Sequence, residues 1–136
     1  MSYGRALLLS APGELAFEPL EDRALGPGEV RIQTLFSGIS AGTELSQYRG
    51  TNPFMHRRWD EQRRLFVDAE GPSWPYPVRN LGYEESGEIV EVGSAVDDLE
   101  PGQRLFGTWG HRTHHIADAD YARDRLLPDD ADPRIG

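Results

Sequence analysis

The fold of this chain is decided by the stretch Leu81-Gly82-Tyr83-Glu84-Glu85-Ser86-Gly87-Glu88-Ile89-Val90-Glu91-Val92-Gly93. It opens with a Gly-x-Glu triplet, continues into a run rich in β-branched residues, and ends at a Val-Gly turn. β-Branched residues framed by glycines are typical of a strand bounded by turns. The stretch therefore predicts a strand within residues 81–92 and a turn over residues 93–99.

Two neighbouring stretches add to this pattern. Upstream, the loop Ser37-Gly38-Ile39-Ser40-Ala41-Gly42 is built from small residues, and Thr43 then stands as an N-cap for a short helix over residues 44–49. Gly50 is the expected stop of that helix. Downstream, the Pro101-Gly102 corner leads into a strand that ends at residue 107. The small-residue loop therefore lies at a junction between a strand and a helix.

Further strands are predicted on both sides. Residues 29–36 alternate with a period of two, since Val30 and Ile32 are separated by polar residues. Residues 5–10 and 15–18 predict a hairpin around a turn at 11–14, and residues 113–117 predict a short strand. Short strands between turns, with 15 Gly and 10 Pro in the chain, predict a mainly β fold, either a small barrel or a sandwich.

Residues 50–80 follow a different pattern. Asn52-Pro53 predicts the start of a helix, along which Met55, Trp59 and Phe66 lie four and seven residues apart. Its exposed face would carry Arg57, Arg58, Arg63 and Arg64. Residues 69–77 contain too many prolines for regular structure and predict a loop. The aromatic side chains of this region either line an apolar pocket or hold the segment in place: Trp59, Phe66, Trp74 and Tyr76.

Composition excludes several classes of function. The net charge of −9 disfavours binding to nucleic acid or to an anionic membrane. Cysteine is absent, which excludes disulfides, thiolate nucleophiles and cysteine-based metal sites from this segment. The apolar run at residues 6–9 is too short for a signal peptide or a membrane span, so a soluble cytoplasmic protein is expected.

Three stretches together resemble the N-terminal GroES-like domain of the medium-chain dehydrogenase/reductase family, the zinc-type alcohol dehydrogenase-like proteins. They are residues 37–44 with Tyr48-Arg49-Gly50 after them, residues 81–93 and residues 101–107. The resemblance implies a partly open β-barrel with a few short helices over residues 1–130, with residues 50–80 as an insertion containing a short helix and a Pro-rich loop. The acidic residues 118–136 would be a connector toward a Rossmann domain that this chain does not contain.

The chain departs from the family at its zinc ligands. The metal-binding cysteine of zinc-dependent members aligns with Ala41, or with Ser40 if the alignment slips by one, and the signature histidine aligns with Tyr83. Zinc needs three protein ligands and an open position, which the remaining Glu84 cannot provide. No zinc is therefore expected, and NAD(P) would bind through a domain outside this chain.

The resemblance also implies roles for individual residues. Tyr83, Thr43 and Glu84 would be catalytic, because without a metal a hydroxyl must polarise the carbonyl oxygen during hydride transfer. Gly42 and Thr43 would contact the cofactor. The predicted substrate-binding residues are Ser40, Tyr48, Trp59 and His111. Ordinary roles stay open, with Thr43 as a helix cap, Tyr83 as a packed aromatic residue and Glu84 as a solvated carboxylate.

His111, His114 and His115 raise the question of a metal site, because imidazole is a common ligand. The loop and strand expected around them do not favour one. A site that faces a substrate or partner, or plain surface histidines, are the alternatives.

The function predicted from the resemblance is the substrate-side domain of a zinc-independent NAD(P)-dependent alcohol dehydrogenase, or of a ketone or enone reductase. This chain alone is expected to be inactive. Its partners would be a small carbonyl or alcohol substrate, a Rossmann domain in the same or another chain, and a second copy in a homodimer. The alternative is a non-catalytic GroES-like binding or assembly module acting with a separate chain. A co-chaperonin ring and a histidine-based metallohydrolase are weaker alternatives.

Overall fold

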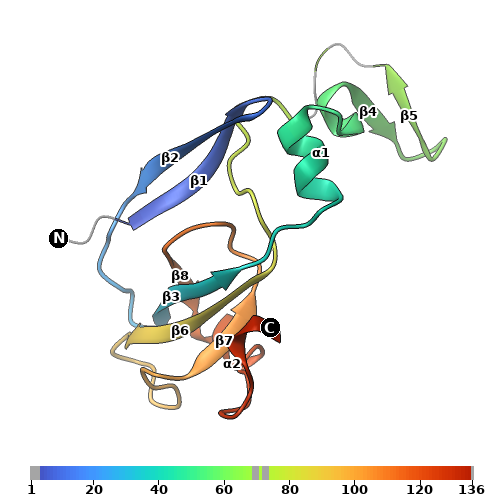
Figure 1. Ribbon diagram of the computed structural model, residues 1–136. Helices are drawn as coiled ribbons and strands as arrows, with labels where there is room; N and C mark the ends of the chain where they lie inside the picture. Colours follow the sequence, from blue (N-terminus) through green and yellow to red (C-terminus); the bar gives the residue numbers. More distant parts are fainter. Residues whose placement is uncertain (1–3, 69–70, 72–73, 136) are drawn as a thin grey trace.

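The computed structural model describes residues 4–68, 71 and 74–135, and shows a mainly β protein (Figure 1). The predicted Pro-rich loop therefore lies partly outside the described residues, at positions 69–70 and 72–73. The strands are β1 (Gly4–Ala11), β2 (Glu14–Leu20), β3 (Glu29–Ser37), β4 (Arg57–Asp60), β5 (Leu65–Asp68), β6 (Glu85–Val92), β7 (Arg104–Gly107) and β8 (His114–Asp118). The helices are α1 (Thr43–Arg49), α2 (Ala119–Arg123) and the 3-10 turns η1 (Pro53–Met55) and η2 (Pro133–Ile135). No helix among the described residues has the length and apolar character to cross a membrane.

A four-stranded antiparallel sheet in the order β7-β6-β3-β8 carries the hydrophobic core. The alternation predicted for residues 29–36 is confirmed, because Val30 and Ile32 are fully buried. Ile89 of β6 and Leu105 of β7 are also fully buried and belong to the same cluster. One face of this sheet is therefore the core face, as the period-two pattern requires.

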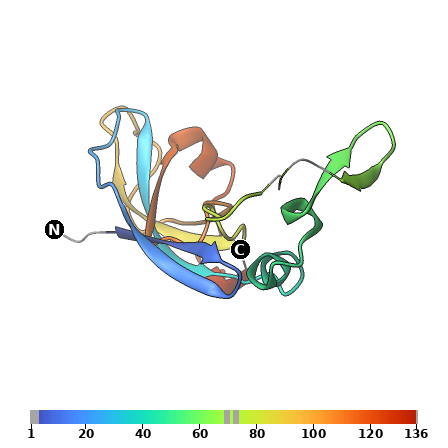
Figure 2. The same cartoon turned by 90° about the horizontal axis from the view of Figure 1, so that it is seen from above.

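The hairpin formed by β1 and β2 leans away from this sheet and is joined to it by a few contacts (Figures 1 and 2). Isolated bridges pair Ala6 with Arg112 and Leu9 with Val78. The β-structure thus curves round without closing, so the expectation of a partly open barrel is confirmed. The opening lies between the hairpin, α1 and the segment before β6.

The prediction of a helix after Asn52 is wrong beyond its first turn. Pro53–Met55 forms a single 3-10 turn, and β4 and β5 follow as a hairpin that projects from the body (Figures 1 and 2). Trp59 and Phe66 are direct partners across this hairpin, with ring centroids 5.1 Å apart. Their spacing fits a helix face and also a cross-strand pair, so the apolar pattern alone could not separate the two.

The short strand predicted over residues 113–117 is confirmed by β8. Within the acidic residues 118–136, α2 follows β8 directly, with Ala119 and Ala122 buried in the core cluster. Leu126 packs against the same cluster and bridges to Leu105. Small alanines made this helix hard to detect, because they carry little hydrophobic signal.

Helix α1 begins one residue earlier than predicted. Gly42 is the N-cap residue, no side chain caps the helix, and Thr43 is the first helical residue. Gly50 ends the helix in the left-handed conformation with φ of 72°, as predicted from its position.

Candidate functional site

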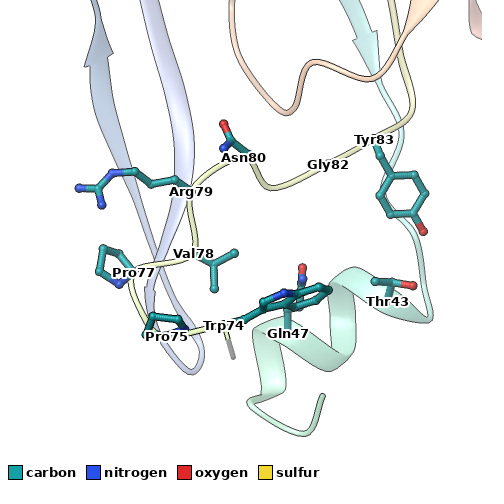
Figure 3. A pocket seen from close by; sticks show the side chains of 10 residues that line it. All are labelled: Thr43, Gln47, Trp74, Pro75, Pro77, Val78, Arg79, Asn80, Gly82 and Tyr83. Carbon is teal, nitrogen blue, oxygen red and sulfur yellow. The ribbon is translucent and has the colours of Figure 1, made fainter. Parts of the chain in front are cut away.

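A cavity of about 490 Å³ lies between α1 and the segment that leads into β6 (Figure 3). Thr43 and Gln47 of α1 form one side, and Gly82 and Tyr83 form the opposite side. The preceding loop completes the lining with Trp74, Pro75, Pro77, Val78, Arg79 and Asn80. The cavity is thus built by segments far apart in the sequence.

Helix α1 supplies two neutral polar groups. Thr43 and Gln47 are four residues apart, so they lie on the same face of the helix. Gln47 is only 9% exposed, yet within the described part of the chain neither its carboxamide nor the Thr43 hydroxyl has a hydrogen-bond partner. Both groups can therefore bond to a molecule in the cavity.

Tyr83 supplies the third polar group. Its side chain is 41% exposed, and its phenol extends toward the end of α1 that carries Thr43 (Figure 3). Gly82 precedes it in the left-handed conformation, with φ of 97°. A Cβ atom at Gly82 would lie 2.8 Å from the His111 ring, so only glycine fits this close approach.

The loop wall is held against α1 by aromatic contacts. Trp74 stacks on Phe54, with centroids 4.7 Å apart and planes 18° apart. The Tyr76 hydroxyl donates a hydrogen bond of 2.9 Å to the backbone carbonyl of Gln47, and burial raises the pKa of Tyr76. The aromatic residues of the insertion therefore divide between the two predicted roles: Trp74 lines the cavity, while Phe66 and Trp59 hold the hairpin.

A buried polar network lies beneath the cavity. The His111 ring contacts the Glu44 carboxylate through Nε2 and the Ser37 hydroxyl through Nδ1. The second Glu44 oxygen accepts a hydrogen bond of 2.6 Å from the backbone amide of Ser40. Glu44 is 4% exposed, so this carboxylate is withdrawn from water and depends on these partners.

Glu85 is the second buried carboxylate of the network. It is 1% exposed, and accepts hydrogen bonds from the Ser37 hydroxyl at 3.2 Å and from the Trp109 backbone amide at 2.9 Å. Its neighbour Glu84 is exposed, as expected for consecutive residues at the start of a strand. The Glu84 side chain lies against Gly38, and its carbonyl accepts a hydrogen bond of 2.6 Å from the Gly38 amide.

The predicted substrate-binding residues lie outside this cavity. Ser40 is in the loop before α1, and Trp59 packs in the β4–β5 hairpin. Tyr48 and His111 line a separate, mainly apolar hollow of about 220 Å³ together with Leu7, Leu15, Ile39, Glu44, Leu45 and Leu81. The predicted catalytic residues Thr43 and Tyr83, in contrast, share one cavity.

The three histidines have three different environments. His115 stacks on Trp109 with planes 9° apart, and burial lowers its pKa to about 4. His114 is next to it on β8, and burial lowers its pKa too. His111 is held by Glu44 and Ser37. Among residues 4–68, 71 and 74–135, no group of three or more histidine, aspartate or glutamate side chains is placed to hold a metal ion.

Sequence reasoning missed Gln47, Glu44, Ser37 and Glu85. Gln47 could have been found, because it follows Thr43 by one helical turn. The other three carry no local signal, since they meet His111 only through contacts across the fold, such as the one from Glu44 over 67 positions of sequence.

Comparison with known proteins gives sequence relatives that include several dehydrogenases. The chain is 30% identical over 106 residues to D-guloside 3-dehydrogenase from Escherichia coli (strain K12), covering 76% of this chain and 30% of that protein. It is 31% identical over 110 residues to (R,R)-butanediol dehydrogenase from Bacillus subtilis (strain 168), covering 73% of this chain and 27% of that protein. The chain thus spans about a third of the length of the relatives it matches. No family model matches it.

Solved structures agree with the sequence relatives. The heterodimer of mitochondrial 2-enoyl thioester reductase Etr1p/Etr2p from Candida tropicalis has a TM-score of 0.62 and 27% identity, covering 94% of this chain and 34% of that one. This partial coverage is consistent with the N-terminal GroES-like domain that the three sequence stretches predicted. Fold, sequence relatives and structural neighbours therefore show that the chain belongs to the medium-chain dehydrogenase/reductase family and forms its N-terminal GroES-like domain.

Proposed function

We propose that this domain forms the substrate half of a zinc-independent, NAD(P)-dependent oxidoreductase that interconverts an alcohol and a ketone, or reduces an enone. The observation that carries the proposal is the pair of hydroxyl groups, Thr43 and Tyr83, on two sides of one cavity (Figure 3). The names of two sequence relatives, a guloside dehydrogenase and a butanediol dehydrogenase, support an alcohol as the substrate class.

The Tyr83 hydroxyl would act on the substrate oxygen. In the reductive direction a hydride adds to the carbonyl carbon, negative charge grows on the oxygen, and a phenol can donate a hydrogen bond to it and then the proton. In the oxidative direction the step reverses, because a hydride leaves the carbinol carbon while the alcohol proton passes to the phenolate form of Tyr83. Thr43 would hold the oxygen from the other side, and Glu84, exposed beside Gly38, would be the third polar group near this opening.

The donor set at this position does not fit a catalytic zinc ion. Ala41 and Tyr83 occupy the positions of two family ligands, and neither provides a thiolate or an imidazole. Glu44, a buried carboxylate that follows the loop, already has both oxygens bonded, one to His111 and one to the Ser40 amide. The proposed reaction therefore uses the hydroxyl groups of the cavity.

NAD(P) supplies or accepts the hydride when it is bound, and we propose that most of its contacts come from a Rossmann domain in the same or a separate chain. A complex of Etr1p with NADP and crotonyl-CoA, 26% identical to this chain, supports NADP as one cofactor. Gly42 faces open space, because a Cβ atom there would meet nothing within 4 Å. Together with Thr43, it leaves room for the nicotinamide end. Ser40, Tyr48, Trp59 and His111 remain predicted substrate contacts only for a larger or differently placed substrate.

The test uses the complete oxidoreductase, in which this domain is joined to its nucleotide-binding domain, because we expect the domain alone to be inactive. With 2,3-butanediol and NAD or NADP as probes, Tyr83→Phe should lower kcat by about 100-fold or more and change KM little, since the hydrogen bond strengthens as charge develops. Tyr121→Phe is the matched control, because that hydroxyl accepts a bond from the Thr108 amide outside the cavity.

Unchanged kcat in Tyr83→Phe would remove the tyrosine from the mechanism. No turnover of any alcohol, ketone or enone by the unchanged enzyme, with no binding of NAD or NADP, would instead favour the alternative of a non-catalytic binding or assembly module. A stoichiometric zinc ion in protein purified without an affinity tag would contradict the zinc-independent assignment.

A further inference from the structure

The His111 side chain lies where two segments of the proposed site meet. Its ring bonds to Glu44, which directly follows Thr43, and to Ser37 at the end of β3. Its backbone is fixed as well, because its amide donates to the Leu81 carbonyl at 2.7 Å and its carbonyl accepts from the Leu7 amide at 2.8 Å. His111 therefore has little freedom to move.

The ring also supports the segment that carries Tyr83. Gly82 passes so close to the ring that a Cβ atom would lie 2.8 Å from both Cε1 and Nε2. The same Cβ atom would lie 2.9 Å from a Glu85 oxygen, so Gly82 rests on the network on two sides. Thr43 is thus one residue from one partner of the ring, and Tyr83 one residue from another.

We infer that His111 is a positioning residue that sets the separation of Thr43 and Tyr83, by bridging Glu44 to the Gly82 segment. The effect of this role on catalysis rests on the proposed function. The bridge itself can be measured without any turnover of substrate. It differs from the substrate contact predicted for His111 from the sequence, because the side chain is only 10% exposed and both ring nitrogens are engaged inside the protein.

Hydrogen bonds continue the bridge from the ring to two carboxylates. Nε2 contacts a carboxylate oxygen of Glu44, and Nδ1 contacts the Ser37 hydroxyl, which donates to Glu85 at 3.2 Å. The ring therefore lies between two buried carboxylates, Glu44 and Glu85, with Ser37 as the link to Glu85.

The titratable and charged groups around the ring are few. From α1 it faces Glu44, and from the start of β6 it faces Glu85, whose oxygen lies 4.0 Å from Nδ1. Arg112 follows His111 in the chain, but its guanidinium donates to the Asn80 side chain. The two carboxylates are thus the charged groups that the ring faces.

The first test is spectroscopic and uses the 136-residue chain as it is. Nitrogen-15 NMR of the imidazole rings should show both ring nitrogens of His111 engaged in hydrogen bonds. His115 is the internal control, because within the described residues neither of its ring nitrogens has a hydrogen-bond partner. A His111 ring nitrogen without a hydrogen bond would overturn the bridge as described.

The second test is kinetic and uses the complete oxidoreductase. His111→Gly should lower kcat at least tenfold with a smaller change in KM, since Thr43 and Tyr83 are misplaced while the cavity lining remains. Added imidazole should restore part of the lost activity by refilling the space. His115→Gly, which also removes a half-buried imidazole, should show no rescue by imidazole.

A double variant that replaces both His111 and Glu44 controls for unfolding caused by an unpaired buried charge. His111→Phe combined with Glu44→Leu leaves no unpaired charge from this pair, so it should fold while kcat stays low. Full kcat in this double variant, or a loss confined to KM, would overturn the positioning role while leaving the proposed function intact. An unchanged enzyme without any oxidoreductase activity would overturn the proposed function, and the NMR result would still decide whether the bridge exists.

Discussion

Thr43 and Tyr83 lie on opposite sides of one cavity, Thr43 at the start of α1 and Tyr83 in the segment before β6 (Figure 3). If both hydroxyls bond the same substrate oxygen, their contributions to catalysis are coupled. A double-mutant cycle in the complete oxidoreductase, with Thr43→Val and Tyr83→Phe, should show a coupling energy of about 1 kcal/mol in kcat/KM.

The control for this cycle pairs Tyr83→Phe with Thr51→Val. The Thr51 hydroxyl bonds to the Ser46 carbonyl and lies outside the cavity, so the two changes should add. Additive effects in both cycles would show that Thr43 and Tyr83 do not act on one atom.

Gln47 should govern substrate binding more than the chemical step. Its carboxamide lines the cavity one helical turn from Thr43, so we expect it to bond a part of the substrate other than the reacting oxygen. Gln47→Ala should raise KM roughly 3- to 10-fold, the value of one neutral hydrogen bond, and leave kcat nearly constant. Gln62→Ala, on the exposed turn of the β4–β5 hairpin, should change neither constant. A fall in kcat alone would place Gln47 in the chemistry instead.

Much of the fold followed from the sequence because its strands alternate and its turns contain Gly or Pro. The alternation of Val30 and Ile32 with polar residues predicts a strand with these two side chains on its buried face, as observed. Gly50 ends α1 at the predicted position. The β4–β5 hairpin did not follow, because its turn contains neither residue. It is made instead by the Asp60 side chain, which accepts hydrogen bonds from the amides of Gln62 and Arg63 at 3.0 and 2.9 Å.

Only those residues of the candidate site that belong to a sequence motif could be predicted. Thr43 and Tyr83 were identified from family stretches, and the structure places them in one cavity. Trp74 and Gln47 come together through a loop whose path has no local signal. His111 was identified as a candidate, yet its partners Glu44 and Glu85 were not, because a buried ion network is a property of tertiary packing.

His115 should make the stability of the protein depend on pH. Burial lowers its pKa from an ordinary value of 6.5 to about 4, so between these values the unfolded chain binds the proton and the folded chain does not. Protonation of His115 in the unfolded chain therefore lowers the free energy of unfolding as the pH falls from about 6.5 toward 4, and has no effect above about pH 6.5. His115→Phe, which keeps a ring against Trp109, should reduce the loss between pH 7.5 and pH 5 by about 1–2 kcal/mol.

Urea unfolding of both proteins at the two pH values measures this difference. Other groups, including the carboxylates and His114, titrate in both proteins and cancel in the comparison. An equal loss of stability in the variant and the unchanged protein would show that His115 is protonated in the folded state as readily as in the unfolded chain.

Gly82 and Gly102 form a matched pair for testing the packing of the site against His111. Their φ angles are 97° and 98°, so alanine at either position adopts the same unfavourable backbone conformation. A Cβ atom at Gly102 would meet nothing within 4 Å, whereas at Gly82 it would meet the His111 ring and Glu85. Gly102→Ala should therefore lower the free energy of unfolding by the conformational cost alone, about 1 kcal/mol, and Gly82→Ala by a further 1–3 kcal/mol. The additional loss of stability in Gly82→Ala should become smaller when His111→Gly is also present, because the ring that the Cβ atom would contact is removed. Equal losses at the two glycines would mean that the Tyr83 segment does not rest on His111.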